Sequence, residues 1–118
     1  MKLDKIREIL ELKPVYNCEE NLNIKTACGA DLMSDVLAFS QEKSLLLTGL
    51  TNPQVIRTAE MIGIKVIIFV RGKQPTPATI ELAWERGIYI FITSRTMFEA
   101  CGMLYEKGLK PENITEIT

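Results

Sequence analysis

Residues 45–64 read LLLTGLTNPQVIRTAEMIGI, residues 67–88 read IIFVRGKQPTPATIELAWERGI, and residues 88–109 read IYIFITSRTMFEACGMLYEKGL. Each stretch is an apolar run, a short polar loop and an amphipathic segment that closes with glycine and an aliphatic residue. Such units in series predict strand–loop–helix repeats and a parallel sheet. Because crossovers between parallel strands are right-handed, the helices should cover both faces. We therefore predict a three-layer α/β fold, a mainly parallel sheet with helices on both faces, built from repeated βα units.

Cap and turn residues mark where these units begin and end. The predicted strands cover residues 44–48, 66–70 and 88–92. Their apolar runs do not alternate with polar residues, which is typical of strands buried on both faces. Asn52-Pro53 and Thr76-Pro77 each combine an N-cap residue with proline at the first helical position. Gly63 and Gly87 suit the left-handed residue that follows a helix.

The chain before the repeat is predicted to add a helix, two strands and another helix. Leu3, Ile6, Ile9 and Leu10 share one helical face and predict a helix over residues 3–12. The other predicted elements are strands over residues 15–18 and 23–27, a helix over residues 29–39 and a last helix over residues 97–107. All of them form one domain over residues 1–118, and the residues after Pro111 are predicted to fray or to add an edge strand.

Aromatic residues on the later helices are predicted to contribute to packing. Trp84 falls in the apolar phase of its helix with Ile80 and Ala83, so we expect it in the core or at an interface. Phe98 and Tyr105 are both predicted to lie in the core.

Composition excludes several classes of protein. The 118 residues include 14 basic and 15 acidic ones, a net charge of −1, without the basic stripe that nucleic-acid or membrane-surface binding requires. The start MKLDKIREIL lacks an apolar signal core, and no run is long enough to span a membrane. Cys18, Cys28 and Cys101 are odd in number and widely spaced, which favours reduced thiols and a cytoplasmic location over a disulfide framework.

The chain contains no histidine. This excludes Ser–His and Cys–His catalytic pairs and any metal site with a histidine ligand. The cysteines form no CxxC-like pair, and neither a Walker motif nor GxGxxG is present. We therefore predict no catalytic residues, no metal and no cofactor, and we expect that the protein is not an enzyme.

Polar residues gather in the loops that follow the predicted strands. In a parallel sheet these loops meet at one edge, and each precedes a helix N-terminus whose free amides favour anions. The candidate residues for a phosphorylated ligand are hydroxyl-bearing, glycine, amide and cationic: Thr48, Gly49, Thr51, Asn52, Arg71, Gly72, Lys73, Thr93, Ser94 and Arg95. Arg71 and Arg95 would be the main contacts, and the amides after Gly49 and Gly72 would complete a cradle. The alternative is that these residues are caps, turn glycines and solvated charges.

A second polar patch is formed by Asp31, Ser34 and Asp35 at the start of the predicted helix over residues 29–39. These residues either cap the helix and supply favourable charge near its first turn, or contact a ligand or partner. Both interpretations remain open at this point.

Five segments resemble those of a known family: residues 45–49 (LLLTG), 53–56 (PQVI), 63–65 (GIK), 85–88 (ERGI) and 93–98 (TSRTMF). On these segments residues 6–109 resemble the DRTGG domain, a small α/β module related in fold to the N-terminal domain of HPr kinase/phosphorylase. In that family the domain accompanies others, including phosphotransacetylases and CBS-domain pyrophosphatases. The resemblance implies a regulatory, dimer-forming module, here as a stand-alone member.

The chain departs from the family at its two namesake positions. After Thr48-Gly49 the family's Asp-Arg pair is replaced by Leu50-Thr51. The family's Thr-Gly-Gly is Val70-Arg71-Gly72, so only the last glycine is kept.

We draw three functional hypotheses from these observations. The first is a non-catalytic regulatory or interaction module, homodimeric, that modulates a partner enzyme or regulator in the cytoplasm. The alternative is a sensor that binds an adenine nucleotide or another phosphorylated small molecule in the strand-end loops. A small enzyme acting on a phosphorylated substrate ranks last.

The sulfur-containing residues give two further predictions. Met33, Met61, Met97 and Met103 are expected on exposed helix faces, where methionine makes adaptable contacts in a homodimer. The thiols are expected to be structural or incidental, with Cys101 buried as a small hydrophobe. Cys28 is the exception, because it precedes a predicted helix N-terminus, which would lower the pKa of its thiol and make it more reactive.

Overall fold

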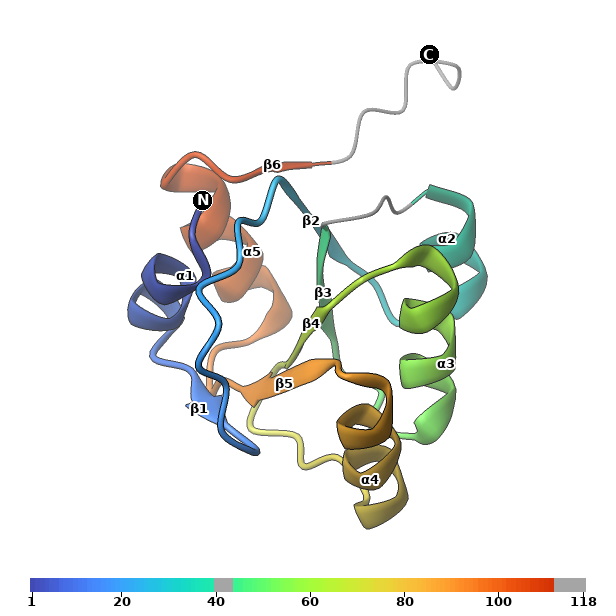
Figure 1. Ribbon diagram of the computed structural model, residues 1–118. Coiled ribbons are helices and arrows are strands. Elements are labelled where there is room, and N and C mark those ends of the chain that lie inside the picture. The colour runs from blue at the N-terminus through green and yellow to red at the C-terminus, as the bar shows by residue number, and fades with distance from the viewer. Residues whose placement is uncertain (40–43, 112–118) are drawn as a thin grey trace.

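The computed structural model describes residues 1–39 and 44–111 (Figure 1). The helices are α1 Leu3–Leu10, α2 Met33–Phe39, α3 Pro53–Ile62, α4 Pro77–Arg86 and α5 Met97–Glu106. The strands are β1 Lys13–Pro14, β2 Thr26–Gly29, β3 Ser44–Thr48, β4 Val66–Phe69, β5 Tyr89–Ile92 and β6 Lys110–Pro111.

The six strands form one sheet in the order β1-β5-β4-β3-β2-β6. Every neighbouring pair is parallel except β1 and β5. In Figure 1, α1 and α5 lie on one side of the sheet and α2, α3 and α4 on the other. The predicted three-layer α/β fold is therefore confirmed.

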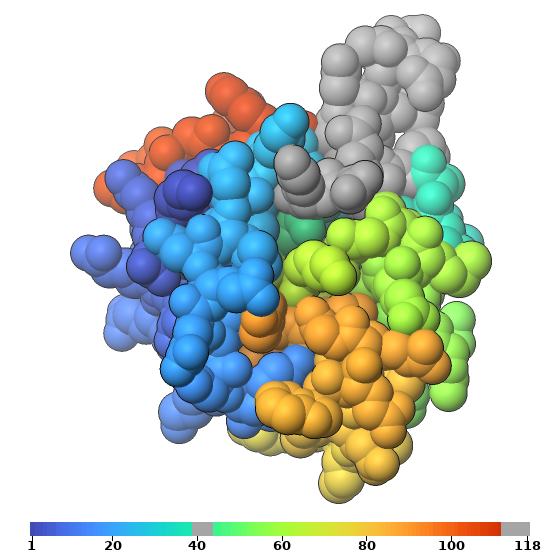
Figure 2. Space-filling view, in the orientation of Figure 1, coloured from blue at the N-terminus to red at the C-terminus, as the bar shows by residue number. Residues whose placement is uncertain are grey.

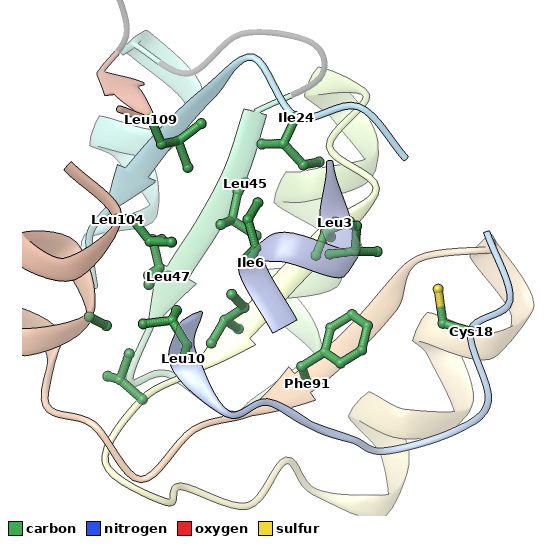
Figure 3. Packing of buried hydrophobic residues seen from close by; sticks show 14 residues of the cluster. Leu3, Ile6, Leu10, Cys18, Ile24, Leu45, Leu47, Phe91, Leu104 and Leu109 are labelled. Carbon is green, nitrogen blue, oxygen red and sulfur yellow. The ribbon is translucent and has the colours of Figure 1, made fainter. Parts of the chain in front are cut away.

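The central strands are buried on both faces, because each face carries its own apolar core. All five residues of β3 are buried, and successive side chains point to opposite faces. Leu45 and Leu47 pack beneath α1 and α5, against Leu3, Ile6 and Leu104 (Figure 3). Leu46 belongs to the opposite cluster, together with buried residues of α2, α3 and α4. The absence of polar alternation in the strand sequences follows from this double burial.

The predicted helix caps are confirmed. The Asn52 side chain accepts a hydrogen bond from the Gln54 amide, and the Thr76 hydroxyl accepts one from the Thr79 amide. Gly63 and Gly87 both have left-handed backbone, with φ of 89° and 68°. These residues stop each helix where the next strand must begin.

The first two strands differ from the prediction. Residues 15–18 form no strand; the pairing is made by Lys13–Pro14, antiparallel to β5, and β2 begins only at Thr26. Pro14 fits this place because an edge strand needs no amide on its outer side. The Val15 amide still bonds to the Ile90 carbonyl, after which the chain leaves the sheet.

Residues 15–25 then cross the N-terminal ends of the parallel strands to reach β2. The hydroxyl of Tyr16 donates to the carbonyl of Ile88, the residue just before β5. The hydroxyl of Tyr89, the first residue of β5, donates to Glu20 at 2.5 Å. Figure 2 shows this segment in light blue across the front of the molecule. Residues 15–25 therefore cover the N-terminal ends of the parallel strands and do not cover the loops at their C-terminal ends.

Several residues predicted in the core are exposed. Phe98 is 88% exposed and Tyr105 67% exposed, so the prediction that they lie in the core is wrong. The reason is the helical phase: α5 docks through Ala100 and Leu104, and Phe98 and Tyr105 lie on its outer side. Trp84 is also 67% exposed and does not lie in the core.

The methionines follow the prediction only in part. Met61 is exposed on α3. Met33, Met97 and Met103 are half-buried and pack against the two cores, so the prediction of exposed faces is wrong for these three. Cys28 lies within β2 and is half-buried, rather than in a loop before a helix.

Candidate functional site

The loops after β3, β4 and β5 lie side by side at the C-terminal end of the sheet. The Val70 amide donates to the Thr48 carbonyl at 3.1 Å, and the Gly72 amide donates to the Thr93 carbonyl at 2.8 Å. The Arg71 amide donates to the Arg95 carbonyl at 2.8 Å. Most of the predicted ligand-binding residues therefore belong to one continuous edge.

Asp31 joins this edge from the loop after β2. Its Oδ1 accepts hydrogen bonds from the Gly49 amide at 2.7 Å and from the Thr48 hydroxyl at 3.0 Å. The bonds fix the loop after β3, whereas Ser34 and Asp35 lie exposed in the first turn of α2. Asp31 is thus a bridge between two loops, a role that neither interpretation of the polar patch foresaw.

Thr51 and Asn52 connect the edge to the helices. The Thr51 carbonyl accepts bonds from the Thr76 amide at 3.2 Å and from the Thr79 hydroxyl at 2.6 Å. Asn52 caps α3, as described above. Both residues therefore hold the helix starts in place.

The loop after β4 is a tight turn with two left-handed residues. Arg71 has φ 59° and Gly72 has φ 67°, and the Lys73 amide closes the turn on the Val70 carbonyl at 3.1 Å. Left-handed backbone costs a residue with a side chain about 1–2 kcal/mol, and glycine avoids this cost. The Arg71 and Lys73 side chains are exposed and make no ion pair with any other described residue. They are the cations that this edge offers to solvent.

The loop after β5 differs, because its groups are bonded internally. Arg95 pairs with Glu11 at 3.0 Å and with Glu99 at 3.9 Å. Thr93 is buried and donates its hydroxyl to the Leu10 carbonyl at 2.8 Å. Ser94 is exposed. Of the two arginines expected to bind an anion together, Arg95 therefore already has carboxylate partners, whereas Arg71 has none among the described residues.

The two amides predicted to complete a cradle for an anion already have acceptors. The amide after Gly49 belongs to Leu50 and donates to the Thr48 hydroxyl at 3.1 Å. The amide after Gly72 belongs to Lys73 and closes the turn. An anion bound by these amides would therefore have to share or replace the acceptors that they already have.

The outer face of α5 has the opposite character, because its apolar groups are uncovered. Phe98, Gly102 and Tyr105 follow one another along this face, and a Cβ added at Gly102 would have no neighbour within 4 Å. Beside Tyr105 lies a cavity of about 200 Å³ lined by residues of α5, β2, β3 and β6 and by Leu109. Its lining is mostly apolar, with Cys101 and Leu104 from α5, and Lys110 is the one charged residue among the described residues that line it. Cys101 is half-buried, and this burial raises the pKa of its thiol.

Contact between α5 and β2 depends on a glycine. A Cβ at Gly29 would lie 2.8 Å from the Cys101 sulfur and 3.1 Å from the Met97 sulfur. A side chain at position 29 would therefore have to displace the side chains of Cys101 and Met97.

A second apolar surface lies across the sheet, on α4. The rings of Tyr16 and Trp84 meet edge to face, with centroids 5.3 Å apart, and with Pro77, Ile80 and Glu81 they line an open groove of about 420 Å³. Burial raises the pKa of Tyr16 to about 12, and the hydrogen bond to Glu20 raises the pKa of Tyr89 to about 12. Sequence reasoning missed this cluster because Tyr16 and Trp84 are far apart along the chain.

Two structural features bear on other kinds of site. Among residues 1–39 and 44–111, no three acidic or cysteine side chains come together in a way that would hold a metal ion. Within the same residues, no helix is both long and apolar enough to cross a membrane.

The chain is similar to a solved structure of a regulatory protein region. This is the crystal structure of the CBS and DRTGG domains of the regulatory region of Clostridium perfringens pyrophosphatase, complexed with the activator diadenosine tetraphosphate. The TM-score is 0.68 at 19% sequence identity, and the match covers 86% of this chain and 45% of that chain. The fold is therefore that of a DRTGG-type domain. No protein-family model and no curated protein matches the chain.

Proposed function

We propose that this chain is a non-catalytic regulatory module that forms a homodimer and contacts a partner protein in the cytoplasm. The observation that carries the proposal is the placement of exposed aromatic side chains on both outer layers. Trp84 lies on α4, whereas Phe98 and Tyr105 lie on α5, across the sheet. Large apolar groups that gather on a surface are typical of protein contacts. Two such faces on opposite sides allow one to bind a second copy and the other a partner.

The similar solved structure supports a regulatory role. Its DRTGG domain belongs to the regulatory region of a pyrophosphatase. Because one fold can serve many functions, the likeness supports the proposal and does not carry it.

The first test of the proposal is the mass of the protein in solution. One chain has a mass of 13.3 kDa, so a homodimer has about twice this mass. We expect sedimentation equilibrium to give the doubled mass at micromolar concentration. A monomer up to millimolar concentration would contradict the homodimer.

The second candidate is a sensor for a phosphorylated small molecule, such as an adenine nucleotide. It is favoured by Arg71 and Lys73, exposed cations at the strand-end edge without an ion pair among the described residues. Arg71 also keeps a left-handed backbone that glycine would adopt more easily. The other candidate residues of this edge, from Thr48 to Arg95, would then position the loop rather than touch the ligand.

Calorimetry separates the two candidates. ATP, ADP, AMP, acetyl phosphate and diadenosine tetraphosphate are titrated into the wild type and into Arg71→Ala and Lys73→Ala. Lys65→Ala is the matched control, because Lys65 is an exposed cation just before β4, at the opposite end of the sheet. A contact to phosphate should be worth about 1.5–3 kcal/mol, and a ligand at 100 times its dissociation constant should stabilise the fold by about 2.7 kcal/mol. No heat with any ligand at millimolar concentration would contradict the sensor and leave the regulatory module.

A further inference from the structure

We propose that the second copy of the chain docks on the outer face of α5, antiparallel to it, across a two-fold axis at Gly102. The inference rests on the homodimer of the proposed function and names its surface. This face consists of Phe98, Gly102 and Tyr105 together with the cavity beside Tyr105.

The first argument is the glycine in the middle of α5. Apart from proline, glycine is the poorest helix former, so an interior glycine needs a reason. Gly102 does not have positive φ, and a Cβ at its position would touch nothing. Within the described chain, neither backbone geometry nor packing therefore requires a glycine here. Close packing of a second helix would require a glycine at this position, because the distance between two helix axes depends on the side chains where they cross.

The second argument is the spacing of the aromatic residues about Gly102. Phe98 lies four residues before it and Tyr105 three residues after it, which is about 6 Å and 4.5 Å along the axis. A two-fold axis at Gly102 therefore places Phe98 of each copy opposite Tyr105 of the other. This is the self-complementary arrangement that a symmetric dimer requires.

The third argument is the apolar cavity beside Tyr105. It opens between α5 and the edge of the sheet, with Leu104 and Leu109 in its wall. The two-fold axis that pairs Phe98 with Tyr105 of the other copy also brings Phe98 to this cavity. The face thus offers a projecting ring at one end of the helix and an apolar hollow at the other.

The area available is sufficient for a core of an interface. A buried phenylalanine or tyrosine covers about 150–250 Å², so Phe98 and Tyr105, at 88% and 67% exposed, offer about 300 Å² per copy. Two copies supply about 600 Å², more than a third of a standard interface of about 1,600 Å². The rest of the interface would have to come from the rim of the cavity and the turns of α5 around Gly102.

The test is sedimentation of the full chain and of three variants over 1 µM to 1 mM. Phe98→Asp should raise the dimer dissociation constant at least 100-fold. Met61→Asp is the matched control, since Met61 is 73% exposed on the other layer of helices, and it should change the constant less than threefold. Circular dichroism checks that each variant is folded.

Gly102→Ala gives the sharper result, because its two effects should have opposite directions. Alanine is the better helix former, so the melting temperature of the monomer should rise. The added methyl group should nevertheless raise the dimer dissociation constant at least tenfold, since it separates the helices at the axis. If Gly102 were instead needed for structure within one chain, Gly102→Ala would lower both the stability of the monomer and its association.

The outcomes distinguish this surface from the homodimer itself. A wild-type monomer would overturn both. A wild-type dimer that Phe98→Asp and Gly102→Ala leave intact would overturn the α5 surface alone. The fluorescence of Trp84, the single tryptophan, should not change with association; a shift would place the second copy on α4 and also overturn the inference.

Discussion

The strand-end loops and the outer face of α5 differ in how far their groups are already satisfied. In the loops, Asp31 bonds to Gly49 and Thr48, and Arg95 pairs with Glu11 and Glu99. On α5, two large rings and a glycine face outward, with an apolar cavity beside them. The loops contain the residue types of a binding site, but most of their polar groups already bond to one another and stabilise this edge of the sheet. The helix face has the residue types of a core, and nothing in the described chain covers it.

The difference shows that residue type alone does not identify a site. A donor or cation that already has a partner gains less from a ligand, because the ligand has to compete with that partner or share it. Exposed apolar surface has no such partner to lose, and burying it is favourable at about 25 cal/mol per Å². The predictions below test how firmly the loops are bonded and how free the remaining groups are.

The largest effect is expected for the buried hydroxyl in the loop after β5. Thr93→Val removes the donor to the Leu10 carbonyl and leaves that carbonyl buried, which should cost about 2–3 kcal/mol of unfolding free energy. Thr58→Val is the matched control, because its buried hydroxyl has no hydrogen-bond partner among the described residues. That substitution should be neutral or stabilise by about 1 kcal/mol. Urea denaturation measures both, and equal losses would contradict the comparison.

An intermediate effect is expected for Asp31. Asp31→Ala removes a carboxylate that accepts bonds from an amide and a hydroxyl, and should cost about 1–2 kcal/mol in urea denaturation at neutral pH. Asp35→Ala alters an exposed carboxylate in the first turn of α2 and should stay within about 0.5 kcal/mol of the wild type. If the two variants lost the same stability, the bridging role of Asp31 would be wrong.

A smaller effect, in the opposite direction, is expected at the turn after β4. Arg71→Gly relieves left-handed backbone and should stabilise the fold by about 1 kcal/mol. Lys73→Gly should instead cost roughly 0.5 kcal/mol, because Lys73 does not have positive φ and glycine makes the unfolded chain more flexible. Melting curves of the two variants check the signs. Loss of stability in Arg71→Gly would mean that the arginine side chain holds the loop.

The smallest effect is expected at the start of α5, where the two regions meet. Glu99 accepts bonds from the amide and hydroxyl of Thr96, and these bonds lower the pKa of its carboxyl. A lowered pKa in the folded state contributes stability above the unfolded pKa, and this stability is lost as the pH falls through the folded pKa. The wild type should therefore lose slightly more melting temperature than Glu99→Gln between pH 7 and pH 3. Equal losses would show that the capping bonds do not depend on charge.

The parallel core of the fold was predictable because local signals and burial agree there. Residues 44–48 and 66–69 form unbroken apolar runs, and proline, glycine and cap residues fix the helices between the strands. β1 was not predictable in the same way. Lys13–Pro14 is a strand only because β5, far along the chain, lies beside it. Two residues carry no period of their own from which to predict a strand.

The site was predictable in composition but not in bonding. The sequence identified the loops, whereas the partners of Asp31 and Arg95 come from distant segments. The exposure of Phe98 was missed because α5 is apolar on several sides, with Met97 and Ala100 on other sides of the helix than Phe98. With so little contrast between its sides, the sequence alone does not fix which one faces the sheet.

The position of α1 has a consequence for the order of folding during synthesis. Leu3, Ile6 and Leu10 pack in a cluster with Phe91 and Leu104, and β1 pairs with β5 and with no other strand of the described residues. During synthesis α1 must therefore wait until β5 and α5 have been made before it can dock, whereas β3, α3 and β4 can assemble as they emerge. We expect pulse-labelled hydrogen exchange to show the Val15 amide protected later than the Val70 amide. Although α1 is made before the strands, it would be among the last of these elements to be locked in place.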